Sequence, residues 1–244
     1  MTPTPPLEPH LLDVHTGCAS LWKPPGLPVF PPNHAEGPSL LDWWATQPAF
    51  PAAAFPAGFQ GGLAHRLDTA TSGLVLAALD PAMLEVLRGW FAARALRKLY
   101  VFHTLSCASG APALAPAGPS LLVELPIGHH DKNRKKMVVA DRPYRTCRGR
   151  WFPAWTRFTF LDILPDGRHR WQAEIRTGVT HQIRVHAAAS GLALCGDPLY
   201  GSTPGEFLLH HARVGFPDGR WSPVAPLPDG STPPLAIGGA DGMV

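Results

Sequence analysis

Charged residues are scarce in this chain. Asp, Glu, Lys and Arg make up 16% of its 244 residues, against about 25% in an average globular domain. A hydrophobic share of 45% nevertheless argues against global disorder. The chain has only four cysteines, which are widely scattered and form no C-x-x-C pair. Their placement argues against a disulfide framework, so a reducing cytoplasm is the compartment we expect.

Long apolar runs that could cross a membrane are also lacking. Two stretches, 43–65 and 101–123, contain no charged residue, but each contains three prolines and neither predicts a spanning helix. The N-terminus has neither the basic nor the apolar region of a secretory signal. The 29 prolines and 24 glycines exclude a coiled coil or an all-helical solenoid, because they interrupt long helices. We therefore expect no membrane association.

The common cofactor motifs are missing as well. No lysine is followed by Ser or Thr, so there is no phosphate-binding P-loop, and neither G-x-G-x-x-G nor G-x-S-x-G occurs. Twelve histidines suggest a metal site. However, His181 and His186 are five positions apart and diverge on a helix, while two other pairs are adjacent and project apart in a strand. The sequence thus predicts neither a cofactor nor a metal ion.

Positive charge is concentrated in one segment. Residues 129–150 hold eight basic residues against two acids, a net charge of +6, which leaves −3 for the remainder of the chain because the total is +3. Such a patch is typical of a protein that binds a polyphosphate. The alternative is a solvated loop whose charges serve solubility. The basic residues are Lys132, Arg134, Lys135, Lys136, Arg142, Arg145, Arg148 and Arg150.

The apolar pattern predicts more strands than helices. Alternating or continuous apolar runs indicate strands at 18–22, 73–79, 99–105, 158–164 and 170–176. Because these strands do not alternate regularly with helices, we expect an α+β fold with a largely antiparallel mixed sheet, flanking helices and long loops. We expect a flexible arm at 1–17, a single catalytic domain at 18–216 and a Pro/Gly-rich tail at 217–244.

Helix ends are marked by capping residues. Ser39 is a predicted N-cap for SLLDWWATQ, and Asp80 caps a helix that has Pro81 at its first position. A third helix is expected from Thr180, as N-cap, to Ser190, with a glycine directly after it as the C′ residue.

Three segments are unusually dense in polar side chains. The first is HRLDTATSG at 65–73, the second is TGVTHQIRVH at 177–186 together with GDPLYG at 196–201, and the third is PIG at 126–128, which leads into the basic segment. Taken alone, the first is compatible with a turn in which Asp68 and Thr71 bind local amides. The second is compatible with a surface helix that has ordinary caps.

Together these segments resemble the RluA family of RNA pseudouridine synthases. The matching pieces are HRLDTATSGL around Asp68, RKLY ending at Tyr100, PIGHHDKNRKKM from Pro126, and TGVTHQIRVH followed by GDPLYG. An upstream WKPPGLPVFP at Trp22 is similar to the family's lysine-proline-glycine turn. The pieces follow the family order over residues 20–211, and five in order are a specific signal.

The resemblance implies an isomerase that converts a uridine in RNA to pseudouridine and needs no cofactor. It assigns Asp68 as the catalytic carboxylate, either nucleophile or proton acceptor. It assigns Arg184 as the arginine that pairs with Asp68 and lowers its pKa, and Tyr100 as the aromatic residue that stacks on the flipped base. Arg66 maps to the residue that takes the vacated place in the RNA or holds the flipped strand. The remaining RNA contacts that we expect are His65, Lys132, Arg134, Lys135, Lys136, His181 and Gln182.

The expected substrate is a structured ribosomal or transfer RNA, and the expected protein is a monomer without an obligate protein partner. Thr69 and Ala70 stand where the family commonly has a charged pair, so contacts there differ. The N-terminal arm is too short for the family's S4 RNA-binding domain, so the catalytic domain should select the target. A catalytically inactive RNA-binding protein on the same fold is the alternative. A metal-dependent nuclease or hydrolase would need clustered carboxylates or histidines at ligand spacing.

Overall fold

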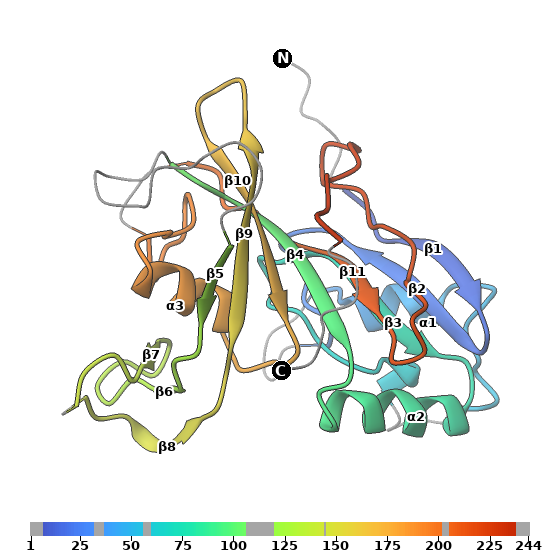
Figure 1. The fold of residues 1–244 in the computed structure, drawn as a ribbon. Helices are drawn as coiled ribbons and strands as arrows, with labels where there is room; N and C mark the ends of the chain where they lie inside the picture. The colour runs from blue at the N-terminus through green and yellow to red at the C-terminus, as the bar shows by residue number, and fades with distance from the viewer. Residues whose placement is uncertain are drawn as a thin grey trace. The chain divides into compact units, whose positions relative to one another are not determined.

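The computed structural model describes residues 7–31, 37–55, 60–105, 120–143, 145–201 and 205–237. The chain divides into two compact units (Figure 1). The first comprises Met1–Lys98 and Leu209–Thr232, and the second comprises Leu99–Leu208 and Pro233–Val244. Strands predominate in both, and most strand pairs are antiparallel. The expected α+β fold with a largely antiparallel mixed sheet is therefore confirmed.

The first unit is built on four strands in the order β1-β2-β3-β11. Strands β1, β2 and β3 pair antiparallel, whereas β11 pairs parallel with β3. Helical segments on the connections complete the unit. The elements are β1 (His10–His15), β2 (Cys18–Lys23), α1 (Leu40–Ala45), the short 3-10 helix η1 (Gln60–Gly62), β3 (Ser72–Ala78), α2 (Pro81–Ala92) and β11 (Leu209–Gly215).

Local capping explains where the first two helices begin. The side chain of Ser39 accepts a hydrogen bond from the amide of Asp42, and the carboxylate of Asp42 accepts one from the amide of Ser39. This reciprocal pair is a capping box. Asp80 accepts a bond from the amide of Met83, and Pro81 occupies the first turn of α2. Both predicted N-caps are confirmed.

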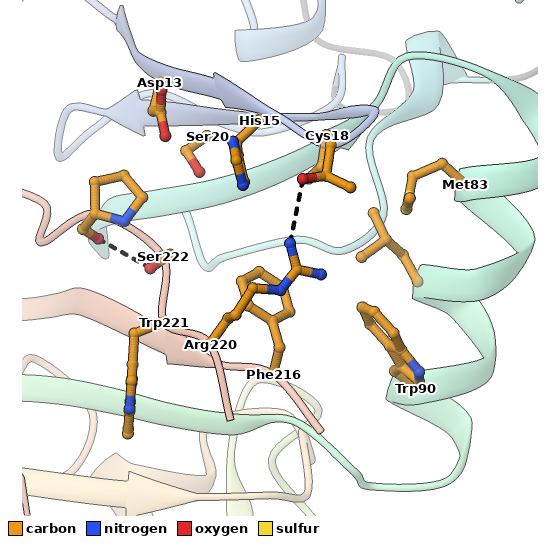
Figure 2. A pocket seen from close by; sticks show the side chains of 13 residues that line it. Asp13, His15, Cys18, Ser20, Met83, Trp90, Phe216, Arg220, Trp221 and Ser222 are labelled. Carbon is orange, nitrogen blue, oxygen red and sulfur yellow. Dashed lines mark hydrogen bonds between the residues drawn. The ribbon is translucent and has the colours of Figure 1, made fainter. Parts of the chain in front are cut away.

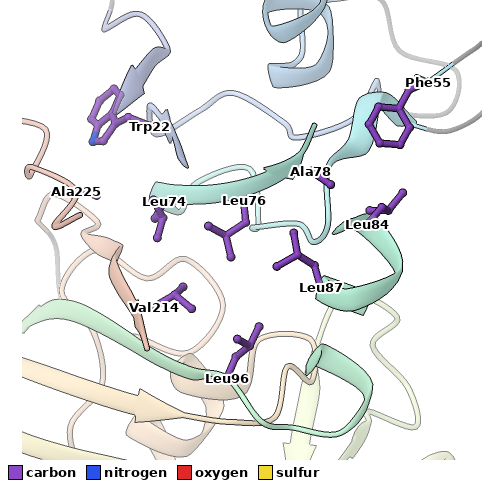
Figure 3. Packing of buried hydrophobic residues seen from close by; sticks show 10 residues of the cluster. All are labelled: Trp22, Phe55, Leu74, Leu76, Ala78, Leu84, Leu87, Leu96, Val214 and Ala225. Atoms are coloured by element: carbon purple, nitrogen blue, oxygen red, sulfur yellow. The ribbon is translucent and has the colours of Figure 1, made fainter. Parts of the chain in front are cut away.

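The core of the first unit forms around β3, all of whose residues are buried. Leu74 and Leu76 of this strand pack with Leu84 and Leu87 of α2 and with Val214 of β11 (Figure 3). A strand that is covered on both faces has no exposed positions, which explains its continuous apolar sequence. This strand positions the loop that precedes it, which contains Asp68.

The described residues of the second unit form two sheets and one helix. Its larger sheet has the strand order β4-β10-β9-β5, and a small sheet has the order β7-β6-β8. Helix α3 (Gln182–Ala189) packs against β7 and β9. The strands are β4 (Arg97–Thr104, which begins in the first unit), β5 (Ser120–Val123), β6 (Ile127–His129), β7 (Met137–Val139), β8 (Arg148–Phe152), β9 (Thr156–Ile163) and β10 (His169–Ile175).

Several elements differ from those that the sequence predicted. Residues 10–15 of the expected flexible arm form β1, which returns into β2 through a turn in which Thr16 and Gly17 both have positive φ. Residues 1–6 of that arm lie outside the described residues. The tail from 217 also packs against the first unit: Ala225 is fully buried, and the carbonyl of Pro226 accepts a hydrogen bond from Trp22 Nε1 at 2.7 Å. Tertiary contacts thus hold residues 10–15 and the stretch around 225–226 in place.

The N-cap of α3 is His181 and not Thr180, and its backbone is left-handed with φ 55°. The C-terminal end is as predicted, with Ser190 as C-cap and Gly191 at φ 75°. The amide of Leu192 bonds to the carbonyl of Ala187 at 2.8 Å, which is the Schellman pattern. Within the described part of the chain, no helix is long and apolar enough to cross a membrane.

Gly73 is required where β3 and β11 approach each other. Its φ is 110°, and a Cβ at this position would collide with the carbonyl oxygen of His211, its partner in the parallel ladder. We expect Gly73→Ala to lower the free energy of unfolding by roughly 2–4 kcal/mol, because backbone cannot yield as a side chain does. Urea unfolding followed by tryptophan fluorescence measures this.

Gly89→Ala in α2 is the matched control. Gly89 has open space around its Cα, and alanine favours a helix, so this variant should be about 0.5–1 kcal/mol more stable than wild type. Equal effects of the two substitutions would contradict the steric argument for Gly73.

Candidate active site

Asp68 lies in the loop that leads into β3. The loop turns there because the amide of Thr71 donates to the carbonyl of Asp68 at 3.0 Å. Strand β3 begins directly afterwards, with the hydroxyl of Ser72 bonded to Nδ1 of His210 at 2.9 Å. The side chain of Asp68 is half-buried. A carboxylate is therefore held at the start of a buried strand while part of it stays accessible.

Lys23 is the residue that holds this loop in place. Its side chain is fully buried at the end of β2, and Nζ donates to the carbonyls of Pro24 at 2.9 Å, Leu27 at 2.7 Å and Thr69 at 3.1 Å. The carbonyl of Thr69 also accepts from the amide of Gly26 at 2.8 Å. Three acceptors match the three donors of an ammonium group. The lysine turn is thus attached to the residue that follows Asp68.

The charge of Lys23 is also coupled to Asp68. Burial lowers the pKa of Lys23 from 10.5 to about 7, and the attraction of the Asp68 carboxylate opposes part of that change. The family resemblance predicted the lysine turn but not a role for Lys23 in the site. The signal was a lone lysine at the end of an apolar strand, CASLWK.

Arg66 and His65 have different environments in the same loop. Arg66 is exposed and, with Leu67 and Thr69, lines a pocket of about 580 Å³ that is closed by 28–31 and Gln60. His65 instead accepts a hydrogen bond from the amide of Leu76 at Nε2, at 3.1 Å. Burial and the nearby Lys98 lower the pKa of His65 to about 3. His65 therefore supports β3 as a neutral ring. Because the residue is only half-buried, its expected contact with RNA stays a prediction.

A second hollow in the first unit lies at the other end of β2 from Lys23 (Figure 2). Asp13, His15 and Ser20 point into it from the hairpin, opposite Arg220 and Phe216. Its volume is about 220 Å³, and it contains none of the predicted site residues. Small-molecule sites usually have about 300–1,000 Å³. The Asp68 loop therefore borders the larger of these two hollows.

In the second unit, Arg184 forms a buried ion pair with Asp197. Nε donates to Oδ2 and Nη2 to Oδ1, both at 2.7 Å, and the side chains are 8% and 0% exposed. The guanidinium also lies over the rings of Tyr200 and Phe207, at 5.2 and 5.4 Å from their centroids. Planar bidentate pairing together with aromatic contacts defines the orientation of Arg184.

Asp197 pairs with Arg184 and also holds the GDPLYG loop in place. Its Oδ1 accepts the amides of Leu199 at 2.8 Å and Tyr200 at 3.1 Å. Burial acts to raise the pKa of Asp197, but the bonds from Arg184 and these amides outweigh it and hold the pKa below its ordinary value. The GDPLYG loop is one of the motifs of the family resemblance, but no role was predicted for Asp197. A substitution of Arg184 would therefore leave Asp197 buried and unpaired, besides any effect on Asp68.

Tyr200 connects the start of α3 with strand β7. Its hydroxyl accepts the amide of Met137 at 2.7 Å and lies 2.9 Å from Nδ1 of His181. Because the amide can only donate, the hydroxyl proton is available for the imidazole nitrogen. This contact holds His181 at the first turn of the helix. The left-handed backbone of His181 thus has a tertiary cause.

Gln182 is buried, contrary to its expected contact with RNA. Its Oε1 accepts from the hydroxyl of Thr177 at 2.8 Å and the amide of Val179 at 3.2 Å. Its Nε2 donates to the carbonyl of Trp155 at 2.8 Å and the hydroxyl of Thr156 at 3.2 Å. These four hydrogen bonds occupy both donor and both acceptor positions of the side-chain amide. Gln182 therefore positions the segment before α3.

The remaining predicted residues lie on β4 and on the loop after β6. Tyr100 is buried in β4, with 8% of its surface exposed. Lys132, Arg134 and Lys135 are exposed, and Lys136 is half-buried. The amides of Lys132 and Asn133 donate to Nδ1 of His130, both at 3.1 Å, and shape this loop into a compact turn. The basic side chains therefore project from a defined scaffold.

The predicted residues are distributed over both units. Asp68, Arg66 and His65 belong to the first unit, and the remaining ones belong to the second. The pairing of Asp68 with Arg184 stays a prediction. Among the described residues, no three His, Cys, Asp or Glu side chains are grouped so that they could hold a metal ion.

Comparison with known proteins identifies the family. The family model of RNA pseudouridylate synthases matches residues 19–189. An uncharacterized RNA pseudouridine synthase of Chloroflexus aurantiacus is 32% identical over 84% of this chain and 62% of that protein. The dual-specificity RNA pseudouridine synthase RluA of Escherichia coli K12 is 34% identical over 62% of this chain and 64% of its own. The chain belongs to the RNA pseudouridylate synthase family, with RluA-type relatives.

Other relatives extend well beyond the matched region. RNA pseudouridine synthase 2, chloroplastic, of Arabidopsis thaliana is 32% identical over 67% of this chain but only 36% of that protein. The chain thus spans between about a third and two thirds of the length of these curated relatives.

Solved structures support the same fold. Human RNA pseudouridylate synthase domain containing 1 superposes with a TM-score of 0.69 at 19% identity, over 97% of this chain and 94% of that chain. Human RNA pseudouridylate synthase domain containing 4 gives 0.60 at 21% identity, over 88% and 87% of the two chains. Both share the mixed α+β architecture.

The buried position of Lys23 has a measurable consequence for stability. The pKa is about 7 in the folded chain and 10.5 when exposed, so between these values the unfolded state binds more protons. Stability then rises with pH across this window. We expect the unfolding free energy of wild type, relative to Lys23→Met, to increase from about pH 7 to 10, by at most about 1.4 kcal/mol per pH unit.

Chemical denaturation at a series of pH values measures the difference. Lys135→Met, at an exposed position, is the control and should follow the wild-type pH dependence. Parallel curves for wild type and Lys23→Met would show that Lys23 does not titrate differently on folding.

Proposed function

We propose that this chain isomerises a uridine in RNA to pseudouridine, with Asp68 as the catalytic carboxylate. The observation that carries the proposal is the position of Asp68 within the family motif HRLD, half-buried and attached through Thr69 to the buried Lys23. The buried Lys23 also interacts electrostatically with the Asp68 carboxylate. The names of the relatives, all RNA pseudouridine synthases, support the same reaction class.

The chemistry exchanges one bond of the uracil base for another. The bond from the sugar carbon C1′ to N1 breaks, the base turns, and C1′ bonds to C5. The proton on C5 leaves and N1 gains one, so the product is an isomer of the substrate and no redox partner is consumed. Asp68 acts either by attacking the nucleoside or by removing a sugar proton. Both routes need an ionised carboxylate with restricted access to water.

Three further residues have supporting roles in this proposal. Arg184, oriented by Asp197, stabilises the negative charge of Asp68. Tyr100 stacks on the flipped uracil. Arg66, exposed beside Leu67, fills the space that the flipped base leaves in the RNA. Extraction of the base costs a few kcal/mol, so contacts of this kind have to compensate.

The proposed substrate is a structured ribosomal or transfer RNA. The exposed lysines and arginine at 132–135 supply phosphate contacts, and a single-stranded or distorted region allows the uridine to leave its stack. The same basic segment would also serve a catalytically inactive RNA-binding protein. Asp68 separates the two possibilities, since binding to phosphates does not require a carboxylate.

Asp68→Asn is the direct test of the reaction. Asparagine keeps the size and the turn-forming ability of aspartate but removes its charge and its nucleophilic oxygen. We expect release of tritium from RNA that contains 5-tritiated uridine to be lost, whereas folding and RNA affinity stay near wild type. Asp166→Asn, in an exposed turn, is the matched control and should retain activity.

Residual activity of Asp68→Asn within about tenfold of wild type, a change of only about 1.4 kcal/mol in the barrier, would overturn this mechanism. If the wild-type protein binds RNA but releases no tritium from any cellular RNA, the inactive RNA-binding protein becomes the better description.

The exposed basic side chains should govern the salt dependence of binding. We expect simultaneous replacement of Lys132, Arg134 and Lys135 by Gln to weaken binding to all RNAs. The log–log slope against salt should fall by about 2, at roughly 0.7 for each phosphate contact. Filter binding at several salt concentrations measures the slope. A slope equal to that of wild type would show that the segment is a solvated loop.

A further inference from the structure

A hollow between α3 and β7 is not used by the proposed chemistry. It lies within the second unit and has a volume of about 350 Å³. Its floor is apolar and comes from two elements, with Met137 and Val139 of β7 on one side and Val185, Ala188 and Ala189 of α3 on the other. The volume falls in the range of pockets that bind small molecules.

The rim of this hollow is cationic and more buried than the rest of the basic segment. Lys136 and Arg145 line the hollow and are half-buried, whereas Lys132, Arg134 and Lys135 are exposed. Asp141 also lines it and lies 3.2 Å from Arg145. Two cations against one carboxylate leave a net positive rim, so the hollow is suited to an anion that carries an apolar part.

We propose that this hollow binds one unpaired nucleotide of the substrate RNA, in addition to the target uridine. The base would lie on the apolar floor, and its phosphate would lie beside Lys136 and Arg145. Unstacked bases on apolar or aromatic surfaces, with phosphates on basic side chains, are the usual mode of single-stranded RNA recognition. The hollow is continuous with the exposed basic turn through Lys136. The inference rests on the proposed function, because it assumes that RNA is the substrate.

The wall of the hollow connects it with Arg184. Tyr200 lines the hollow. Its hydroxyl accepts a hydrogen bond from the amide of Met137 on the floor, and the guanidinium of Arg184 lies over its ring. A nucleotide in the hollow would therefore contact the residue that helps to orient Arg184. Occupancy would favour RNAs that present an unpaired nucleotide in addition to the target uridine.

The first variant of the test fills the hollow without changing its charge. Ala189 is exposed at the last position of α3, and Ala189→Met adds a flexible side chain that suits a helix. The matched control is Ala92→Met, at the exposed last position of α2. Lys136→Gln removes one charge of the rim and keeps most of the stem. Adenosine 5′-monophosphate, adenosine and inorganic phosphate are the probes, titrated into the full chain and followed by amide NMR shifts.

We expect the mononucleotide to shift the amides of Met137, Val139 and Ala188 and to bind more tightly than adenosine or phosphate alone. Ala189→Met and Lys136→Gln should each weaken this binding about tenfold, whereas Ala92→Met should not change it. Shifts that are absent from these amides, or that survive in Ala189→Met, would overturn the proposal. Equal binding of phosphate and mononucleotide would show an anion site without a base site and would also overturn it.

Tritium release from RNA separates this proposal from the proposed function. With an active wild type, Ala189→Met should raise KM for RNA about tenfold and leave kcat near wild type. An unchanged KM would refute the nucleotide site while the function stands. If wild type releases no tritium, the proposed function fails, and the mononucleotide titration still decides whether the hollow binds a nucleotide.

Discussion

A buried ammonium group must be surrounded by oxygen acceptors, and this constraint shapes the Asp68 loop. Lys23 is inside the first unit, where an unpaired charge would be prohibitively costly. Its Nζ is satisfied by the carbonyls of Pro24, Leu27 and Thr69, two from its own turn and one from the distant loop. The proline-rich turn and the Asp68 loop therefore have to assume their positions together. The position of Asp68 follows from the coordination of the lysine next to it.

The second unit meets the same requirement with arginine. Arg184 is buried, but Asp197 faces it with both oxygens and is itself stabilised by amides of the GDPLYG loop. The planar guanidinium makes directed hydrogen bonds that fix its orientation. The ammonium group of Lys23 is a compact charge, and carbonyl oxygens surround it. The interior charges thus fix the conformation of the loops that contain their partners. The basic side chains at 132, 134 and 135 are exposed instead, so the buried and the exposed cations stand in different environments.

Prediction succeeded where the decisive contacts are local. Ser39 with Asp42, and Asp80 with Met83, are three residues apart, so the sequence alone indicated the starts of α1 and α2. The long apolar strands were predicted within a few residues of their ends. Strand β1 was taken for part of a flexible arm, since its mostly exposed residues show no alternation and only pairing with β2 orders it. The three strands of the small sheet are too short for a periodic signal.

The sequence by itself determined the family and the fold class, because motif residues and their order are present in the linear chain. Through the resemblance it also assigned roles to Asp68, Tyr100 and Arg184, and these roles stay predictions. It could not determine the partners of those residues. Thr69 is 46 positions from Lys23, and no local pattern predicts that one carbonyl. Gln182, expected at the RNA, is inside because its amide is bonded both by the preceding residues 177–179 and by the distant residues 155–156. Tertiary structure decided these roles, since burial makes each polar group depend on neighbours that only folding brings together.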